Sequence, residues 1–249
     1  MPIDHSKTPT TPAYRVVSEN LRQRITRGEV ETGQALPTET MLANQFGVHR
    51  STIREGLRQL EQDGLLQRAG KRLIVSIPRH KDLAHAAERA LRMSQVTFRD
   101  VWEMALTLEP MCARLAAERI TDDELNKLKD NIARTAALVN AGQTPIAETI
   151  EFHSLVAEAS HNQVLLLARA PVSLLMRSGF AAIAPALPQS GARLLDAHRH
   201  IFDSLKQGDA ESAVAWTHKH LMDHKRGFEF VGLDMDSPIP NTQATQEDT

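Results

Sequence analysis

The sequence predicts a mainly α-helical protein of two domains, in which three helices and a β-hairpin precede an all-helical bundle. Aromatic residues make up only 4% of the 249 residues, which favours helical cores built from Leu, Ala and Val. Residues 13–77 contain three helical patterns and one hairpin pattern, whereas residues 98–230 repeat the helical period without an alternating strand pattern. The length suffices for two modest domains, each with its own core.

The first two helices have recognisable start and stop signals. Residues 1–12 contain three Pro and three Thr and are expected to be disordered. Residues 14–27 then place apolar side chains on one helical face. A second helix is expected to begin after Thr38, a good N-cap residue, and to end at Gly47, which suits the left-handed position that follows a helix.

The third helix is expected at about residues 49–63, with Ile53, Leu57 and Leu60 as its buried stripe. Two short apolar strands, at residues 65–68 and 73–77, flank a basic tip and predict a hairpin. Three helices and a hairpin within residues 13–77 indicate a winged helix-turn-helix domain.

The remaining sequence predicts a linker, a helical bundle and a C-terminal tail. Residues 78–96 are expected to form a linker with a helix near 80–93, and residues 97–232 a bundle of about six to seven helices. Helices are expected near residues 98–118, 122–141, 145–159, 163–183, 190–207 and 210–230. The polar tail, residues 233–249, contains two Pro and is expected to be disordered.

The front of the third helix is cationic and rich in hydroxyl groups. Arg50 and Arg54 lie one helical turn apart, and Ser51 and Thr52 lie between them. A recognition helix enters the major groove N-terminus first, where Arg reads guanine and hydroxyl groups contact phosphates or base edges. Residues 13–79 hold eleven Lys and Arg against seven Asp and Glu, which also favours DNA. The alternative interpretation is an ordinary solvated helix face.

Several function classes find no support in the sequence. The lone Cys112 provides no internal disulfide and suits a reducing compartment. No signal-peptide pattern and no run of 18 apolar residues occurs, so a cytoplasmic protein without a membrane segment is expected. No HExxH, G-x-S-x-G or phosphate-binding Gly-rich loop is present, and we expect no enzyme. A metal hydrolase would also need a general base near its metal-bound water.

Seven of the eleven histidines fall between residues 153 and 224. His153, His198 and His220 lie on three different expected helices, and three imidazoles that converge in a bundle suit Zn²⁺ or a similar divalent ion. The alternative is that each is exposed or singly hydrogen-bonded, as helical histidines usually are. We assign the other four, which are His161, His200, His218 and His224, to the surface or to supporting positions.

The segment LPTETMLANQFGVHRSTIREGLRQLEQDGLLQRAGKRLIV, residues 36–75, resembles the DNA-binding domain of the GntR family of bacterial transcription regulators. The resemblance implies a cytoplasmic homodimer, at the nucleoid when bound, on a pseudo-palindromic operator in double-stranded DNA. The residues it implies at that interface are Thr38, His49, Arg50, Ser51, Thr52, Arg54, Gly70, Lys71 and Arg72. His49 stands where the family has Ser or Thr, and Thr40 where many members have a base-reading Arg, so the operator is expected to differ from the usual one.

Residues 98–228 resemble the FadR C-terminal ligand-binding domain, through FHSLVAEASHN, LDAHRHI and LEPMCARLAAER. The resemblance implies a divalent metal (Zn²⁺, or Ni²⁺ or Mn²⁺) held by His153, His198, His220 and an Asp one turn before the first. Thr149 stands at that Asp position and is a poor ligand, so the site is weaker or a carboxylate effector completes the shell. Thr149 and Arg177 are expected at the effector, with Arg169 or Arg134 as alternative cations.

These features predict a metabolite-responsive DNA-binding regulator, a repressor, whose helical domain binds a carboxylate or sugar acid. The effector would change the spacing of the two DNA-binding heads through residues 78–96. The alternative is a ligand-independent dimeric DNA-binding protein whose helical domain is purely structural.

Overall fold

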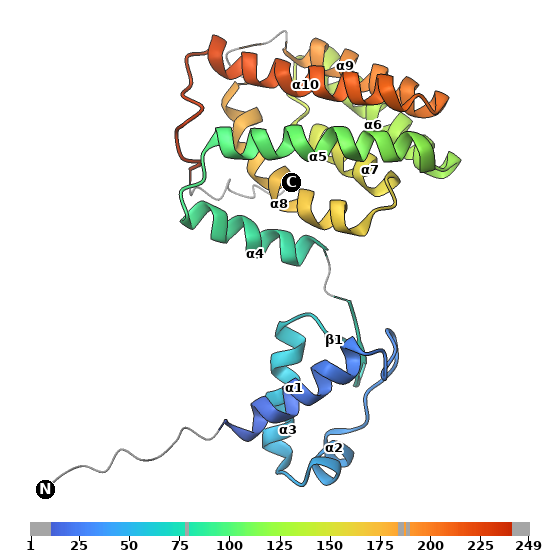
Figure 1. Ribbon diagram of the computed structural model, residues 1–249, viewed down its shortest axis with the longest axis vertical. Coiled ribbons are helices and arrows are strands. Elements are labelled where there is room, and N and C mark those ends of the chain that lie inside the picture. Colours follow the sequence, from blue (N-terminus) through green and yellow to red (C-terminus); the bar gives the residue numbers. More distant parts are fainter. Residues whose placement is uncertain (1–10, 78–79, 184–186, 188–189, 241–249) are drawn as a thin grey trace, which may run out of the picture. The chain divides into compact units, whose positions relative to one another are not determined.

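The computed structural model describes residues 11–77, 80–183, 187 and 190–240, which form ten helices and one two-stranded sheet (Figure 1). The mainly helical fold class is therefore confirmed. The chain divides into two compact units, Met1–Arg79 and His80–Thr249. Most of the expected disordered N-terminus, residues 1–10, lies outside the described residues, as do linker residues 78–79 and the end of the tail, 241–249.

The first unit is a winged helix-turn-helix. Its elements are α1 (Ala13–Thr26), α2 (Glu39–Phe46), α3 (Arg50–Gln62), β1 (Leu66–Ala69) and β2 (Arg72–Val75). The two strands pair antiparallel, with Leu66 opposite Val75 and Ala69 opposite Arg72. An isolated bridge from Ala35 to Ile74 adds the segment before α2 to this wing.

Local signals set the ends of these elements. The Thr38 hydroxyl accepts the Met41 N–H at 3.3 Å, and Gly47 ends α2 in the left-handed region with φ of 64°. Gly70, with φ of 62°, opens the two-residue turn of the hairpin. His49 is the N-cap of α3, but its side chain makes no cap hydrogen bond. The departure from Ser or Thr at this position thus removes a cap.

Close packing of α1 on α3 depends on one glycine. A Cβ at Gly56 would lie 3.0 Å from the Tyr14 carbonyl oxygen and 3.1 Å from Val17 Cγ1. The core beneath includes the predicted stripe of α3, which is fully or almost fully buried. Its buried residues are Val17, Leu21, Val30, Leu36, Leu42, Ala43, Ile53, Leu57, Leu60, Leu66 and Val75. This packing fixes α3 with its opposite face free.

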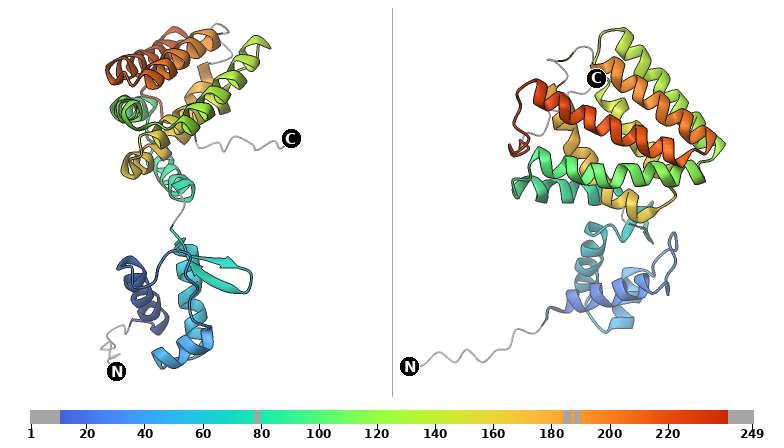
Figure 2. Two further views of the ribbon diagram at one scale, coloured as in Figure 1. Left: turned by 90° about the vertical axis from the view of Figure 1, so that its right-hand side faces the viewer. Right: turned by 45° about the horizontal axis from the view of Figure 1, so that its top comes forward.

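The second unit is a seven-helix bundle. Its helices are α4 (His80–Met93), α5 (Phe98–Arg119), α6 (Asp122–Asn140), α7 (Ile146–Ala159), α8 (Gln163–Ile183), α9 (Ser190–Gln207) and α10 (Ala210–Phe230). The last helix packs against α5 and α9, α6 packs against α7 and α9, and α4 packs against α8 (Figure 2). Helix α5 also contacts α7 and α8, which makes it central to the bundle.

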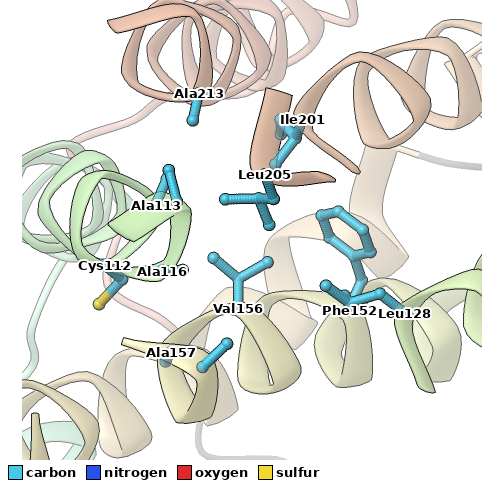
Figure 3. Close-up of a cluster of buried hydrophobic side chains, with 12 residues drawn as sticks. Cys112, Ala113, Ala116, Leu128, Phe152, Val156, Ala157, Ile201, Leu205 and Ala213 are labelled. Carbon is cyan, nitrogen blue, oxygen red and sulfur yellow. The ribbon is translucent and has the colours of Figure 1, made fainter. Parts of the chain in front are cut away.

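Small residues let the central helices approach closely. Ala113 and Ala116 of α5 face Ala213 of α10, and all three are completely buried (Figure 3). Larger residues, such as Phe152 of α7 and Leu205 of α9, fill the space between the remaining helices. The bundle core thus fixes the three helices that carry the candidate histidines.

Helix α8 contains a stretch, Gln163–Ala181, that is long and apolar enough to cross a membrane by length and composition. Here it packs against α4, α5 and α7, and it carries Arg169, which is 3% exposed and ion-paired. A helix of a bundle can have the same length and composition, and 33% of this stretch is buried within the unit.

The tail departs from the expectation of disorder from residue 233 onward. Residues up to 240 are described, and Met235 and Ile239 are buried. The segment lies along the α4–α5 junction, where the Ile239 N–H donates to the Val96 carbonyl at 2.9 Å and the Arg99 N–H donates to the Met235 carbonyl at 2.9 Å. Two apolar anchors in a polar stretch explain why composition was misleading.

Candidate functional site

The first turn of α3 presents the cationic side chains that the sequence singled out. Arg50 and Arg54 have side chains 61% and 66% exposed, Ser51 is exposed and Thr52 is half-buried. The buried stripe of α3 faces the core, so these residues occupy its outward face. A surface of two guanidinium groups and two hydroxyl groups suits phosphates and base edges.

Glu39, at the first position of α2, pairs with both arginines. Arg54 donates from Nε to Oε1 at 3.1 Å and from Nη2 to Oε2 at 2.8 Å, and Arg50 Nη2 lies 3.8 Å from Oε2. The hydrogen bonds from Arg54 lower the pKa of Glu39, so the carboxylate stays ionised. This acid inside the cationic surface was not singled out in the sequence.

The wing presents its basic tip to solvent. Lys71 and Arg72 are exposed beside Gly70, and neither has an ion-pair partner among the residues that the structure describes. Arg68, on β1, instead pairs with Glu61 at 3.1 Å. The two tip residues are therefore free to meet a phosphate.

In the bundle, His153 of α7, His198 of α9 and His220 of α10 converge in the interior. All three are buried, and one nitrogen from each lies within 4.8 Å of the others. The closest approach is 3.3 Å, between His153 Nε2 and His220 Nε2. His198 is stacked on Phe152, with ring centroids 3.8 Å apart. The packing that buries Phe152 therefore also orients His198.

A buried ion pair orients His153. The Nδ1 of His153 lies 2.8 Å from Glu109 Oε2, and Arg169 Nε donates to Glu109 Oε1 at 2.7 Å. Burial alone would raise the pKa of Glu109, but the charge of Arg169 and the hydrogen bonds from His153 and Arg169 outweigh it and hold that pKa at about 2. An ionised carboxylate at Nδ1 fixes the proton there and leaves Nε2 as the free lone pair.

The other two members of the cluster are neutral bases. Burial lowers the pKa of His198 well below its usual value and that of His220 to about 3. Neither ring nitrogen of His198 has a hydrogen-bond partner among the described residues, and both are inaccessible to solvent. A buried imidazole whose nitrogens have no hydrogen-bond partner is available to coordinate a metal ion.

These residues fit a divalent metal ion. Zn²⁺ is bound by neutral imidazole nitrogens, often by three histidines with one position left open. Glu109 on His153 supplies the supporting carboxylate that metal-binding histidines usually have. Thr149, one turn before His153, is buried and its hydroxyl donates to the Pro145 carbonyl at 2.7 Å. Residue 149 thus provides no anionic ligand.

A cavity adjoins the cluster between α7, α8, α9 and α10, and it encloses about 680 Å³ including its mouth. Its polar lining includes Thr149, Ser190, Arg193, His220, Asp223 and His224. Phe180, Leu187 and Leu194 provide apolar lining.

The arginines proposed as effector contacts lie elsewhere. Arg177 is exposed on α8 and is absent from the cavity lining, so the structure does not bring it to the histidines. Arg169 is held by Glu109, and Arg134 pairs with Glu151. The arginine that does line the cavity is Arg193 of α9.

Sequence reasoning missed Glu109 and Arg193. It named Arg169 only as an alternative effector cation, and it assigned His224 to the surface or to a supporting position. Two of the four carried a usable signal, because a charged residue within an apolar helical run, as in TLEPMC and LLLARAPV, indicates a buried partner. Arg193 and His224 carried none, since the packing of α9 and α10 alone brings them to the cavity.

Comparisons with known proteins identify relatives of both units. Residues 13–74 match the model of the bacterial regulatory proteins of the gntR family, and residues 100–223 match the FCD domain. The chain is 28% identical to the HTH-type transcriptional regulator YdhC of Bacillus subtilis, over 86% of this chain and 88% of that protein. It is 27% identical to the Glc operon transcriptional activator of Escherichia coli, over 90% and 91%.

Among solved structures, the chain is similar to Streptococcus agalactiae GntR, with a TM-score of 0.61 and 27% identity. The similarity covers 86% of this chain and 99% of that one. Both units of the fold therefore recur together in a protein of comparable length.

Proposed function

Because the chain belongs to the GntR family of DNA-binding transcription regulators and carries an FCD effector-binding domain, we propose that it is a homodimeric, metabolite-responsive repressor. Each winged helix takes one half-site of a pseudo-palindromic operator, as two-fold symmetric regulators do. The effector is a small carboxylate or sugar acid. The protein acts in the cytoplasm, where its operator lies.

The DNA contacts are assigned to the outward face of α3 and the wing. Arg50 and Arg54 read bases, while Ser51, Thr52 and the wing tip contact phosphates. The exposure of these side chains beside a buried apolar stripe supports the assignment. Thr38 and His49 begin α2 and α3, where backbone N–H groups point outward and suit phosphates.

The effector site is assigned to the cavity beside the three histidines. The observation that carries this proposal is the convergence of His153, His198 and His220 in the bundle interior, where both nitrogens of His198 are unpaired among the described residues and His220 lines the adjoining cavity. A divalent ion, Zn²⁺ before Ni²⁺ or Mn²⁺, would be held by these nitrogens and would supply a Lewis-acidic position for a carboxylate oxygen. Thr149 lines the same cavity at the position where a ligating carboxylate is absent.

Binding of the effector is proposed to change the relative placement of the two heads, with residues 78–96 as the coupling segment. An effector shifts such an equilibrium only by its differential affinity for the two states. If the helical domain is instead purely structural, operator affinity will not respond to any organic acid.

The decisive experiment combines metal content with operator binding. The purified full chain is expected to hold about one divalent ion per chain, measured by plasma mass spectrometry. The triple variant His153→Ala, His198→Ala, His220→Ala should lose it. A matched variant changes three exposed histidines, His85, His200 and His218, and should retain it. A metal-free wild-type protein, even after incubation with excess Zn²⁺, would refute the metal centre.

Operator binding tests the other half of the proposal. Arg54→Ala should weaken operator affinity by about tenfold to a hundredfold, the value of one bidentate base contact. Arg58→Ala, four residues later and also exposed, is the matched control and should have little effect. Equal effects of both variants would mean that α3 presents a different face to DNA.

A further inference from the structure

A fourth histidine reaches the cavity without joining the metal cluster. His224 follows His220 by four residues on α10, and both line the cavity. The group of nitrogens within 4.8 Å of one another contains His153, His198 and His220 but not His224. The cavity thus has two separate polar positions on one helix face, about 6 Å apart along the helix axis by the rise per residue.

His224 has no hydrogen-bond partner of its own. Both of its ring nitrogens are inaccessible to solvent and unpaired within the described part of the chain. Burial holds its imidazole neutral, so one nitrogen is a donor and the other an acceptor. Buried polar atoms are nearly always paired in folded proteins, and an orphan of this kind calls for a partner that the protein itself does not supply.

The packing around His224 does not explain why a histidine is there. Its ring lies 4.4 Å from the Phe180 ring and 5.3 Å from the Phe228 ring, measured between centroids. An apolar residue of similar size would make these contacts without leaving two nitrogens unpaired. The two unpaired ring nitrogens of His224 are therefore the feature that a bound ligand would explain.

The remaining lining limits what that occupant can be. Phe180, Leu187 and Leu194 offer an apolar wall for a short carbon chain. Asp223 is held by Arg226, with Nη1 to Oδ1 at 2.8 Å, whereas Arg193 is exposed and has no ion-pair partner in the described ranges. Because Asp223 is paired with Arg226, the cation Arg193, unpaired among the described residues, favours a small organic anion beside the apolar wall.

We infer that His224 hydrogen-bonds a second polar group of the effector, whose first carboxylate is bound at the three-histidine cluster. This inference rests on the proposed function. An acid with a second oxygen-bearing group, namely a small dicarboxylic or hydroxy acid, can supply the hydrogen-bond partner that His224 lacks. A simple monocarboxylate satisfies only one of the two positions. His224 is thus a specificity-determining residue.

The test uses the full chain loaded with Zn²⁺ and four probes: the three-carbon acids propionate and lactate, and the four-carbon diacids succinate and malate. Calorimetric titration of the wild-type protein should show at least one of the last three binding about tenfold or more tightly than propionate, the value of a buried hydrogen bond. His224→Leu should abolish that preference while leaving propionate binding unchanged. His224→Gln, which keeps a donor and an acceptor, should restore part of it.

Two controls separate the possible failures. His200→Leu changes an exposed histidine of α9 and should behave as wild type. Zn²⁺ affinity, measured by chelator competition, should be the same in His224→Leu and wild type. If His224→Leu folds poorly by circular dichroism, His224→Phe, which also lacks ring nitrogens, takes its place and should likewise lose the preference.

Each contrary outcome has a distinct meaning. Loss of Zn²⁺ affinity in His224→Leu would make His224 a metal ligand and overturn the inference. An unchanged preference for bifunctional acids would remove His224 from the effector contact while leaving the proposed function intact. Failure of the Zn²⁺-loaded wild type to bind any probe would overturn the proposed effector class itself, and the inference with it.

Discussion

Glu39 holds Arg54 through two hydrogen bonds, 3.1 Å from Nε and 2.8 Å from Nη2, at the surface where the protein is expected to meet DNA. The same carboxylate lies 3.8 Å from Arg50. A phosphate or a guanine edge must therefore compete with Glu39 for both guanidinium groups. Glu39 therefore lowers the affinity of this surface for any DNA. The decrease is smallest for a DNA site that offers Arg54 two hydrogen-bond acceptors.

The variant Glu39→Gln is expected to bind non-specific DNA about twofold to fivefold more tightly, the range for one exposed ion pair. Discrimination between operator and non-specific DNA should fall correspondingly. Fluorescence anisotropy with the two duplexes at several salt concentrations would measure both. Glu55→Gln removes the same charge from a comparable pair with Arg58 and is the control. A loss of operator affinity without a change in non-specific affinity would mean that Glu39 orients Arg54 instead of competing for it.

Local patterns accounted for the helices and for most of the first unit. The spacing of Ile53, Leu57 and Leu60 matches the helical period, and all three are buried. Helix α2 begins after Thr38 and ends at Gly47, two residue types whose capping preferences can be recognised in a sequence. The ordered tail could not be predicted, because Met235 and Ile239 are buried in clusters with residues of α5, α8 and α10, most of which lie far away in the sequence.

The candidate site was likewise predictable only in part from the sequence. The three histidines could be placed on separate helices, and the family resemblance brought them together before the structure did. The pairing of Glu109 with Arg169 spans 60 residues, and no helical period reports a contact at that separation. Likewise, Arg177 and Arg193 are indistinguishable in sequence, and only the packing of α8 and α9 decides which one reaches the cavity.

Removing the charge of Glu109 should destabilise the second unit. Glu109→Gln leaves the buried Arg169 without its counter-ion, and breaking such a pair from one side costs about 3–5 kcal/mol. Urea unfolding would measure the free energy of unfolding. The double variant Glu109→Gln, Arg169→Met should recover much of the loss, since no unpaired charge then remains buried. Equal stabilities of the single and double variants would show that the ion pair does not control the fold here.

The metal-free protein should lose stability below about pH 6.5. Burial lowers the pKa of His198 well below its usual value and the pKa values of His220 and His224 to about 3, whereas the unfolded chain protonates them near 6.5. The unfolded state therefore binds more protons as the pH falls. Each histidine should lower the free energy of unfolding by up to about 1.4 kcal/mol per pH unit between these values.

Glu109 adds to this effect at lower pH. Its pKa is about 2 in the folded state against a usual 4.5, so its contribution is present above pH 4.5 and is lost as the pH falls toward 2. Urea unfolding at pH 7.5, 6.5 and 5.5 isolates the histidines. His224→Gln should reduce the slope by the share of one group. A free energy of unfolding that is constant over this range would contradict the buried, neutral state of the cluster.

The C-terminal segment should act as a clamp on the α4–α5 junction. Ile239 is 2% exposed and its N–H donates to the Val96 carbonyl at 2.9 Å, while the Phe98 and Arg99 N–H groups donate to the carbonyls of Ser237 and Met235. Ile239→Ala removes a buried side chain, at a cost of about 2–5 kcal/mol if the site does not collapse. The amides of residues 98 and 99 should then exchange with deuterium faster, because local opening no longer has to break apolar packing.

Asp236→Ala removes only the exposed ion pair with Arg99 and should leave that exchange nearly unchanged. Unchanged exchange in Ile239→Ala would mean that backbone hydrogen bonds alone hold the segment, and that α4 and α10 are not joined through its packing.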